Sequence, residues 1–403
     1  MGRFPHLRGC FPVALAVALL LPATATAATA PSPGDGDPGI NTEVDEPTPL
    51  APVVSAFSDV GSGYTWARQA INHVANDHPW MDDWGNKFRP GLVESRAYLA
   101  RAMVRAFGNG ETVDPSIAFS DLPAGDPFYG FANVAVQNGW MRPDGDRFRP
   151  DAPVTIHILY RALVSALPLD AEIDGLDDIH SPDGTRFAHP STFPTTELGM
   201  RLAFRYNHPQ EAKDVLPNDP LPRAEVAYAL WKAKTVPQYK LDDLRPFRTI
   251  ELPNVGGPMR KVIEWDMRYV GYPYIWGGEW FKKNGSQPTG GWDCSGFMWW
   301  SLKRPLSWYD PTKAGRPYNG WSLPQRTSAT MASSGGRIGY ANLKPGDLMF
   351  YDGSGDGVVD HVDMYAGNGW AFDTGSSVGG TSLLQVGPGT WYRDHFKWGR
   401  RIM

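Results

Sequence analysis

Cysteine is nearly absent from this sequence, which has only Cys10 and Cys294 among its 403 residues. Cys10 lies in a basic N-terminal stretch, ahead of a short apolar run over residues 11–21 and an A-x-A cleavage pattern that ends at Ala27. We therefore expect residues 1–27 to be an export signal that is removed. The secreted protein then keeps Cys294 alone, which excludes an internal disulfide and a thiolate zinc site.

Excess positive charge and a second long apolar run are also missing. The formal net charge of -5 argues against a nucleic-acid-binding protein, because such proteins usually present a basic surface. The run over residues 11–21 is too short to remain as a membrane-spanning helix, and no other run follows it. The C-terminal part also lacks the paired ligand spacings of a metal site. We expect no membrane span, no metal and no cofactor.

Two segments have the composition of connectors. Residues 28–52 are rich in Pro, Gly, Asp and Thr and have almost no large apolar side chains, which predicts a disordered linker. Three prolines over residues 237–256 predict a second linker. Because the chain is too long for one ordinary core, these linkers are expected to separate domains.

A repeat with a period of roughly 60 residues occupies the region between the linkers. A helical stretch follows each F-R-P, at residues 95–107 and 155–167. Units of this kind bury their apolar faces on one another, which predicts an all-α region with units at 53–112 and 113–172 and an eroded third copy at 173–236. The matching segments are F-S-D at 57–59 and 119–121, W-M at 80–81 and 140–141, and F-R-P at 88–90 and 148–150.

These units resemble S-layer homology repeats in their F-x-D start, their F-x-P loop and the R-A opening of the next helix, at Arg96-Ala97 and Arg223-Ala224. The resemblance implies three copies that pack together and hold a wall-attached polysaccharide. The second copy has Ile156-His157 in place of R-A, so one polymer groove is in doubt. A helical spacer that binds no polymer is the alternative.

Residues 257–403 have a compact α+β pattern, with helices at about 259–270 and from Cys294, followed by short strands and glycine-rich turns. Asp293 is a good N-cap, so Cys294 falls in the first helical turn. There the unpaired N–H groups and the helix dipole lower the pKa of the thiol and favour a reactive thiolate. A cysteine in the apolar interior of a helix would instead be inert.

Two histidines of this domain could act as the base of a thiolate enzyme, His361 and His395. His361 starts an alternating strand after the nucleophile, whereas His395 lies in an aromatic tail, so His361 is favoured. The strand turns at 367–369 and returns to Asp373. If all three residues form the loop, Asp373 shares a face with His361 and orients its ring; with a two-residue loop it faces the other way.

Five motifs occur in order along the C-terminal domain: G-Y-P-Y-I-W-G-G at 271–278, D-C-S-G-F at 293–297, L-P and R-T-S within 323–328, L-K-P-G-D-L-M-F at 343–350, and H-V with a G-N-G turn within 361–369. With them the domain resembles the NlpC-type family of bacterial cell-wall cysteine peptidases, which are papain-like. The resemblance implies Cys294 as nucleophile and His361 as base. Asp373 stands where the family often has His. The resemblance also implies that the substrate cleft is lined by Tyr274, Asp293 and Ser295.

The resemblance implies hydrolysis of a peptidoglycan stem peptide, often at the bond between D-glutamate and the following diamino acid. We expect a secreted, extracellular and wall-associated peptidase, held near its substrate by the N-terminal repeats. Two alternatives stay open. One is a wall-anchored binding or structural protein with an inactive peptidase-like domain, and the other is an amidase or acyltransferase that acts on another cell-surface amide.

Overall fold

The structure is a computed structural model that describes residues 54–208, 214–278, 290–303, 323, 325–333 and 335–402. The predicted export signal (1–27) and first linker (28–52) lie outside these residues. All described residues belong to one compact unit. Within the described ranges, no helix is long and apolar enough to cross a membrane.

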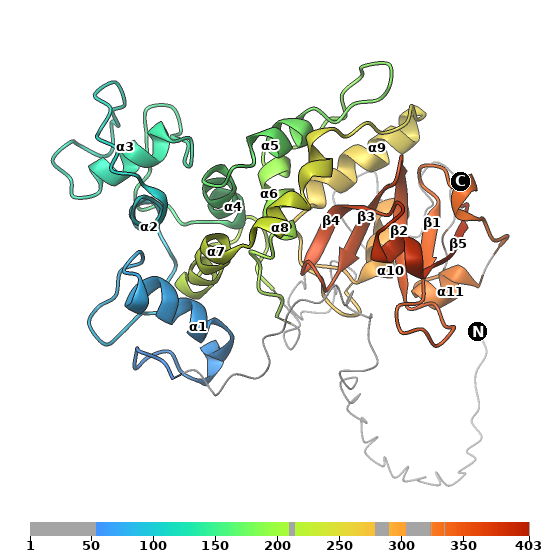
Figure 1. Cartoon of the computed structure of the whole chain (residues 1–403), viewed down its shortest axis with the longest axis horizontal. Coiled ribbons are helices and arrows are strands. Elements are labelled where there is room, and N and C mark those ends of the chain that lie inside the picture. Colours follow the sequence, from blue (N-terminus) through green and yellow to red (C-terminus); the bar gives the residue numbers. More distant parts are fainter. Residues whose placement is uncertain are drawn as a thin grey trace, which may run out of the picture. The chain divides into compact units, whose positions relative to one another are not determined.

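The region before the sheet is helical (Figure 1). The helices predicted at 95–107 and 155–167 are present as α2 and α4, and each of the first two repeat units contains a helix, a loop and a second helix. The helix α5 crosses the predicted boundary between the second and third units at 172/173. The elements are η1 (Ser62–Ala67), α1 (Arg68–Ile71), η2 (Asn72–Asp77), α2 (Arg96–Phe107), α3 (Tyr129–Gln137), α4 (Ile156–Ser165), α5 (Asp170–Asp177), α6 (Phe193–Arg201) and α7 (Arg223–Thr235).

The repeated F-S-D and F-R-P segments bind each other in the same way in both clear copies. The Asp59 carboxylate accepts hydrogen bonds from the backbone N–H groups of residues 88 and 89, both at 2.9 Å. The Asp121 carboxylate accepts from residues 148 and 149 at 2.8 and 2.9 Å. The arginine of each F-R-P has a positive φ, 59° and 58°, so the same bend is built twice. The sequence repeat is thus a structural repeat.

A closed ring of three backbone hydrogen bonds joins the three units. The N–H of Glu94 donates to the carbonyl of Leu221, that of Leu221 to Val154, and that of Val154 back to Glu94, at 2.9, 2.8 and 2.9 Å. Each of these residues lies just before the last helix of its unit, α2, α4 or α7. The segment that ends in α7 therefore takes the place of a third unit, although its sequence lacks the F-x-D opening.

Two of the three helix starts insert an arginine into a neighbouring unit. The Arg96 Nε donates to the carbonyl of Phe148 at 2.8 Å, and the Arg223 Nε donates to the carbonyl of Phe88 at 3.0 Å. Both guanidinium groups also lie over the ring of the phenylalanine that they contact. The second unit has the buried, apolar Ile156 at this position and cannot make these bonds. The three contacts between units are therefore not equivalent.

The segment predicted as a second linker, residues 237–256, is packed rather than free. It forms α8 (Gln238–Asp242) and η3 (Arg245–Arg248). Four of its apolar side chains are almost fully buried in the main core: Leu244, Phe247, Ile250 and Leu252. Its three prolines do not leave it free, because the apolar residues between them bury enough surface to dock the segment.

The C-terminal part is a five-stranded antiparallel sheet in the order β4-β3-β2-β1-β5 (Figure 1). The helix α10, which begins at Cys294, packs against β2 and β3. The strands are β1 (Leu348–Tyr351), β2 (His361–Gly367), β3 (Trp370–Gly375), β4 (Gly380–Gln385) and β5 (Phe396–Arg400). The other elements are α9 (Gly257–Asp266), η4 (Met267–Tyr269), α10 (Cys294–Lys303), α11 (Ser328–Ala332), η7 (Tyr340–Asn342) and α12 (Trp391–His395).

The turn between β2 and β3 determines which way Asp373 faces. Gly367 pairs with Trp370, which leaves a loop of residues 368 and 369, but the register shifts before Gly367 and Met364 pairs with Phe372. The bulge takes up one residue on β2. Asp373 therefore keeps the face of His361 although the loop has only two residues, an arrangement that neither sequence-based alternative anticipated.

Candidate active site

The cysteine stands at the start of α10, on a well-capped helix end. The Asp293 Oδ1 accepts hydrogen bonds from the Gly296 N–H at 2.6 Å and from the Ser295 hydroxyl at 3.1 Å. Asp293 therefore caps the helix, as predicted, and Cys294 lies in its first turn. Here the helix dipole stabilises a negative sulfur. Cys294 is buried, with 5% of its surface exposed.

Arg326 holds the cap in place. One guanidinium nitrogen, Nη1, donates to Asp293 Oδ1 at 2.9 Å and to the Ser295 hydroxyl oxygen at 2.8 Å. The other, Nη2, donates to Asp293 Oδ2 at 3.1 Å and to the carbonyl of Gly278 at 2.9 Å. Charge-assisted pairs of this forked geometry are strong and directional. Arg326 thus ties the end of the Y-I-W-G-G segment to the start of α10, a role that sequence reasoning missed.

Tyr274 lies beside the segment that leads into Cys294. It forms a parallel bridge with Trp292, and the N–H of Ile275 donates to the Trp292 carbonyl at 2.9 Å. Its own N–H donates to the Gly379 carbonyl at 3.2 Å, next to β4. The structure therefore brings Tyr274, Asp293 and Ser295 together at the start of α10.

His361 contacts two carboxylates through one ring nitrogen. Its Nε2 lies 2.9 Å from Asp373 Oδ1 and 3.0 Å from Asp363 Oδ1. All three residues are fully buried. Asp363 was not singled out from the sequence, although the H-V-D spacing puts it on the same face of a strand as His361. Because α10 packs against β2, the helix of Cys294 and the strand of His361 are in direct contact.

Burial and negative charge keep one of these carboxyls protonated. Burial, and next the charge of Asp373, raise the pKa of Asp363 to about 8, although His361 acts in the opposite direction. Near neutral pH the Asp363 carboxyl is therefore largely protonated. Two tyrosines border the pair: the Tyr351 ring lies 5.7 Å from the His361 ring, and the Tyr392 hydroxyl donates to Asp373 Oδ2 at 3.4 Å.

The ligand-type atoms of His361, Asp363 and Asp373 lie within 4.8 Å of one another, a spacing that a metal ion could also bridge. Both carboxylates, however, already contact the nitrogen that a metal would need. The other histidine of the domain, His395, contacts the Trp391 carbonyl at 2.9 Å and stacks on its ring.

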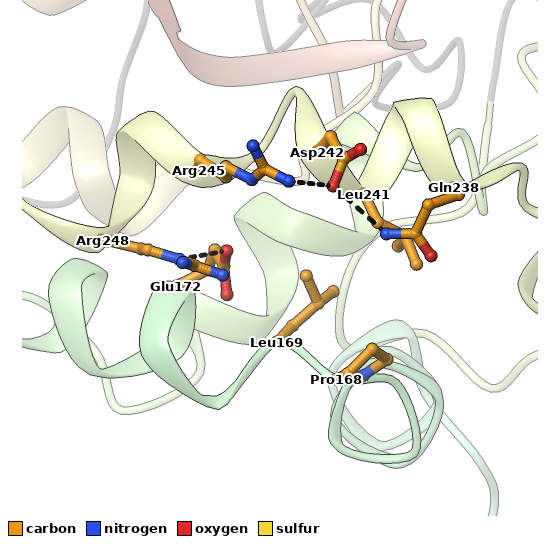
Figure 2. A pocket seen from close by; sticks show the side chains of 8 residues that line it. All are labelled: Pro168, Leu169, Glu172, Gln238, Leu241, Asp242, Arg245 and Arg248. Atoms are coloured by element: carbon orange, nitrogen blue, oxygen red, sulfur yellow. Dashed lines mark hydrogen bonds and ion pairs between the residues drawn. The ribbon is translucent and has the colours of Figure 1, made fainter.

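The helical region has a separate hollow (Figure 2). Its volume is about 440 Å³, and ion pairs join Arg245 to Asp242 and Arg248 to Glu172 across it, at 2.7 and 2.8 Å. None of the predicted site residues lines it. Its walls come from α5, α8, η3 and the residues before α5, so it is not part of the peptidase-like site.

A helix that begins with the cysteine and packs on a sheet whose later strand begins with the histidine defines the papain-like class. Within this class, residues 271–398 match the model of the NlpC/P60 family. The C-terminal part of the chain is therefore an NlpC/P60 domain.

Several characterised proteins are similar to this part of the chain. The murein DD-endopeptidase MepH of Escherichia coli is 32% identical over 140 residues, which is 34% of this chain and 43% of that protein. The bifunctional muramidase/DL-endopeptidase CwlT of Bacillus subtilis is 32% identical over 135 residues, 33% of each chain. The gamma-D-glutamyl-L-lysine dipeptidyl-peptidase of Bacillus subtilis is 33% identical over 115 residues, 28% of this chain and 31% of that protein.

Solved structures are similar as well. The peptidoglycan hydrolase RipB of Mycobacterium tuberculosis is 26% identical, with 38% of this chain and 74% of that chain covered and a TM-score of 0.25. The chain spans less than half the length of each of the three curated relatives above.

Proposed function

We propose that this chain is a secreted cysteine endopeptidase that hydrolyses peptide bonds in the stem peptides of peptidoglycan. The observation that carries the proposal is the buried contact of Asp373 with His361, which equips the histidine on β2 as an oriented base next to the helix of Cys294. The names of the similar proteins, which are endopeptidases and hydrolases of murein or peptidoglycan, support the substrate class.

The proposed reaction has two steps. Because both carboxylates contact Nε2, we assign the exchange of the proton with Cys294 to Nδ1 of His361. Nδ1 takes the thiol proton, the sulfur attacks the amide carbonyl, and the N–H of Cys294 donates to the developing oxyanion. The imidazolium then protonates the leaving amine and a thioester remains. A water molecule that gives its proton to Nδ1 hydrolyses the thioester and restores the thiol.

The residues near the nucleophile support a role in substrate binding. Tyr274, Asp293 and Ser295 are proposed to border the cleft, as the family resemblance implies. The contacts of Asp293 and Ser295 with Arg326 fix that border relative to Cys294. For the bond cleaved, we propose the link between D-glutamate and the diamino acid, which the name of one similar protein supports.

The helical region is proposed to keep the enzyme at the wall. The basic and apolar start of the sequence supports export, and the ring of three units supports the three-copy packing that the S-layer resemblance implies. If these units bind a wall polysaccharide, the peptidase works at a raised effective concentration of its substrate.

Digestion of purified peptidoglycan tests the proposal. Wild type, Cys294→Ala and Cys294→Ser are incubated with it, and the soluble products are identified by mass spectrometry. We expect stem-peptide fragments cut after D-glutamate from the wild type and none from either variant. An inactive wild type that still sediments with the wall would support the binding-protein alternative. Release of a different amide product would support an amidase or acyltransferase.

A further inference from the structure

The outer edge of the sheet is completed by side chains of the helical region. The edge strand β4 pairs with β3 on one side. Its other side bonds to residues 271 and 272 through the carbonyl and N–H of Thr381, and to the helical region through Leu383. The N–H of Leu383 donates to Glu197 Oε2 at 2.8 Å, and the carbonyl of Leu383 accepts from Arg201 Nη2 at 3.0 Å. Both side chains belong to α6. Glu197 and Arg201 thus bind the backbone N–H and carbonyl of Leu383, which a sixth strand would otherwise bind.

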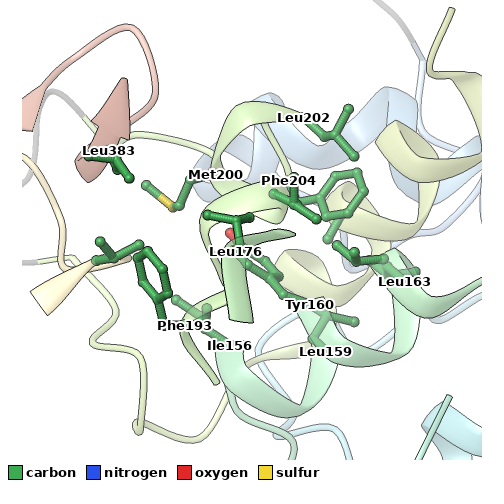
Figure 3. Packing of buried hydrophobic residues seen from close by; sticks show 14 of the residues in the cluster. Ile156, Leu159, Tyr160, Leu163, Leu176, Phe193, Met200, Leu202, Phe204 and Leu383 are labelled. Atoms are coloured by element: carbon green, nitrogen blue, oxygen red, sulfur yellow. The ribbon is translucent and has the colours of Figure 1, made fainter. Parts of the chain in front are cut away.

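This contact is buried and close. Glu197 is fully buried, and Arg201 Nε lies 3.2 Å from Glu197 Oε1, so the two side chains also hold each other. Met200, on the same helix, belongs to the apolar core that includes Leu383 (Figure 3). A Cβ at Gly380 would lie 2.2 Å from the Tyr272 carbonyl oxygen, which is outside α6, and 3.0 Å from the Met200 Cε on α6. The helix α6 is therefore packed tightly against β4.

The contact is linked to the candidate site through one strand pairing. In the register of β3 and β4, Phe372 pairs with Leu383 and Asp373 pairs with Ser382. Asp373 is therefore one pair away from the residue that Glu197 and Arg201 bind, and it is the carboxylate at 2.9 Å from His361. A shift of β4 would move β3, and with it the oxygen that orients the imidazole.

We propose that Glu197 and Arg201 are positioning residues of the peptidase, which hold β4 and β3 so that Asp373 stays on His361. The inference rests on the proposed function, since it assigns these two residues to the same reaction. It makes the helical region a structural part of the active site in addition to any role at the wall.

The electrostatics agree with this geometry. Burial raises the pKa of Glu197 to about 7, Arg201 lowers it, and the charge of Asp373 raises it. The elements α4, α5 and β4 pack on α6. The strand β4 has no titratable side chain, and Glu172 of α5 is ion-paired. On α4, burial lowers the pKa of His157 to about 4, so His157 is neutral near pH 7. Above pH 7 Glu197 therefore adds a negative charge near Asp373, which favours the imidazolium form of the base.

The test compares Glu197→Gln with the matched control Glu172→Gln. Both glutamates are buried and ion-paired to an arginine in the helical region, but Glu172 contacts Arg248 and not the sheet. Three properties are measured on the full chain: kcat and KM on a stem-peptide fragment, the thermal midpoint, and the rate of Cys294 alkylation by iodoacetamide as a function of pH. Peptide mass spectrometry separates Cys294 from Cys10.

We expect Glu197→Gln to lower kcat about tenfold with KM within about twofold, because a small misplacement of a catalytic group is costly. The upper limb of the alkylation profile should move to lower pH. Glu172→Gln should lower the thermal midpoint but leave kcat and the profile unchanged. If Glu197→Gln is too unstable to purify, Arg201→Lys replaces it, because a single ammonium cannot reproduce the forked contact. A smaller fall in kcat is then expected, and the alkylation profile should stay in place because Glu197 keeps its charge.

The result that overturns the inference is a Glu197 variant that loses thermal stability to the same extent as the control but keeps kcat and the alkylation profile. Failure of the proposed function looks different. In that case wild type and Cys294→Ala are equally inactive on the fragment, and the alkylation profiles of the two glutamate variants still show whether Glu197 acts on the cysteine–histidine pair.

Discussion

Replacement of Asp363 by Asn tests the protonated carboxyl beside His361. The two side chains have the same shape, but Asn stays neutral at every pH. The pKa of an Asp in an unfolded chain is about 3.9. Burial, with the charge of Asp373, raises that of folded Asp363 to about 8. Between pH 4 and pH 8 the folded state therefore holds a proton that the unfolded chain has released.

The sign of the effect follows from this difference in bound protons. A group that binds more protons in the folded state makes the protein less stable as the pH rises, and the loss is complete above the folded pKa. Each pH unit corresponds to about 1.4 kcal/mol, so a shift of four units costs on the order of 5 kcal/mol at pH 8. Asn cannot release a proton and does not incur this loss.

The assay is thermal unfolding of wild type and Asp363→Asn at pH 5, 6, 7 and 8. We expect the midpoint of the variant to rise relative to wild type by roughly 2 °C per pH unit. Each unit corresponds to about 1.4 kcal/mol, and an unfolding entropy of about 2.1 cal/mol/K per residue makes about 1 kcal/mol equal to roughly 1.2 °C in a chain of this size. Asp242→Asn, at the exposed ion pair with Arg245, is the control and should show no such trend. A difference between wild type and Asp363→Asn that stays constant over this pH range would refute the reasoning.

Three further outcomes are expected. Asp373→Asn should lower kcat about 100-fold. The double variant with Asp363→Asn should be slower by a further tenfold or more, because in the single variant Asp363 ionises and replaces the lost carboxylate. Equal kcat values for the single and double variants would contradict this. Arg326→Lys should lower kcat and the thermal midpoint together, measured by peptide hydrolysis and calorimetry, since Lys cannot bridge Asp293 and the Gly278 carbonyl. Asp59→Ala should lower the free energy of unfolding, measured in urea, by about 2 kcal/mol, because it leaves two backbone N–H groups of the F-R-P loop without their acceptor. An unchanged urea midpoint would show that water replaces the carboxylate.

The sequence was sufficient to predict those features that depend on residues close together in the chain. The helix starts at Arg96 and Ile156 each follow a Ser or Thr, and the cap of Asp293 on α10 follows from the residues around Cys294. The linker prediction for 237–256 was wrong because prolines were weighed and the buried apolar side chains between them were not.

Contacts between distant parts of the chain could not be predicted in this way. The place of Asp373 depends on a bulge before Gly367, which the loop sequence does not reveal. Arg326 reaches Asp293 from 33 residues away, and Glu197 reaches Leu383 from 186 residues away. Such pairs form only when the whole chain has folded, so the residue types alone do not single them out.

The ring of backbone hydrogen bonds between the three units has a consequence for biosynthesis. Glu94 can complete its bonds only after Leu221 has been made, and Arg223 binds Glu94 across 129 residues of chain. The first unit therefore cannot complete these bonds until the third unit has been synthesised, and closure over such a distance is slow. A chain truncated before α7 should be a good substrate for proteolytic quality control rather than a smaller version of the same bundle.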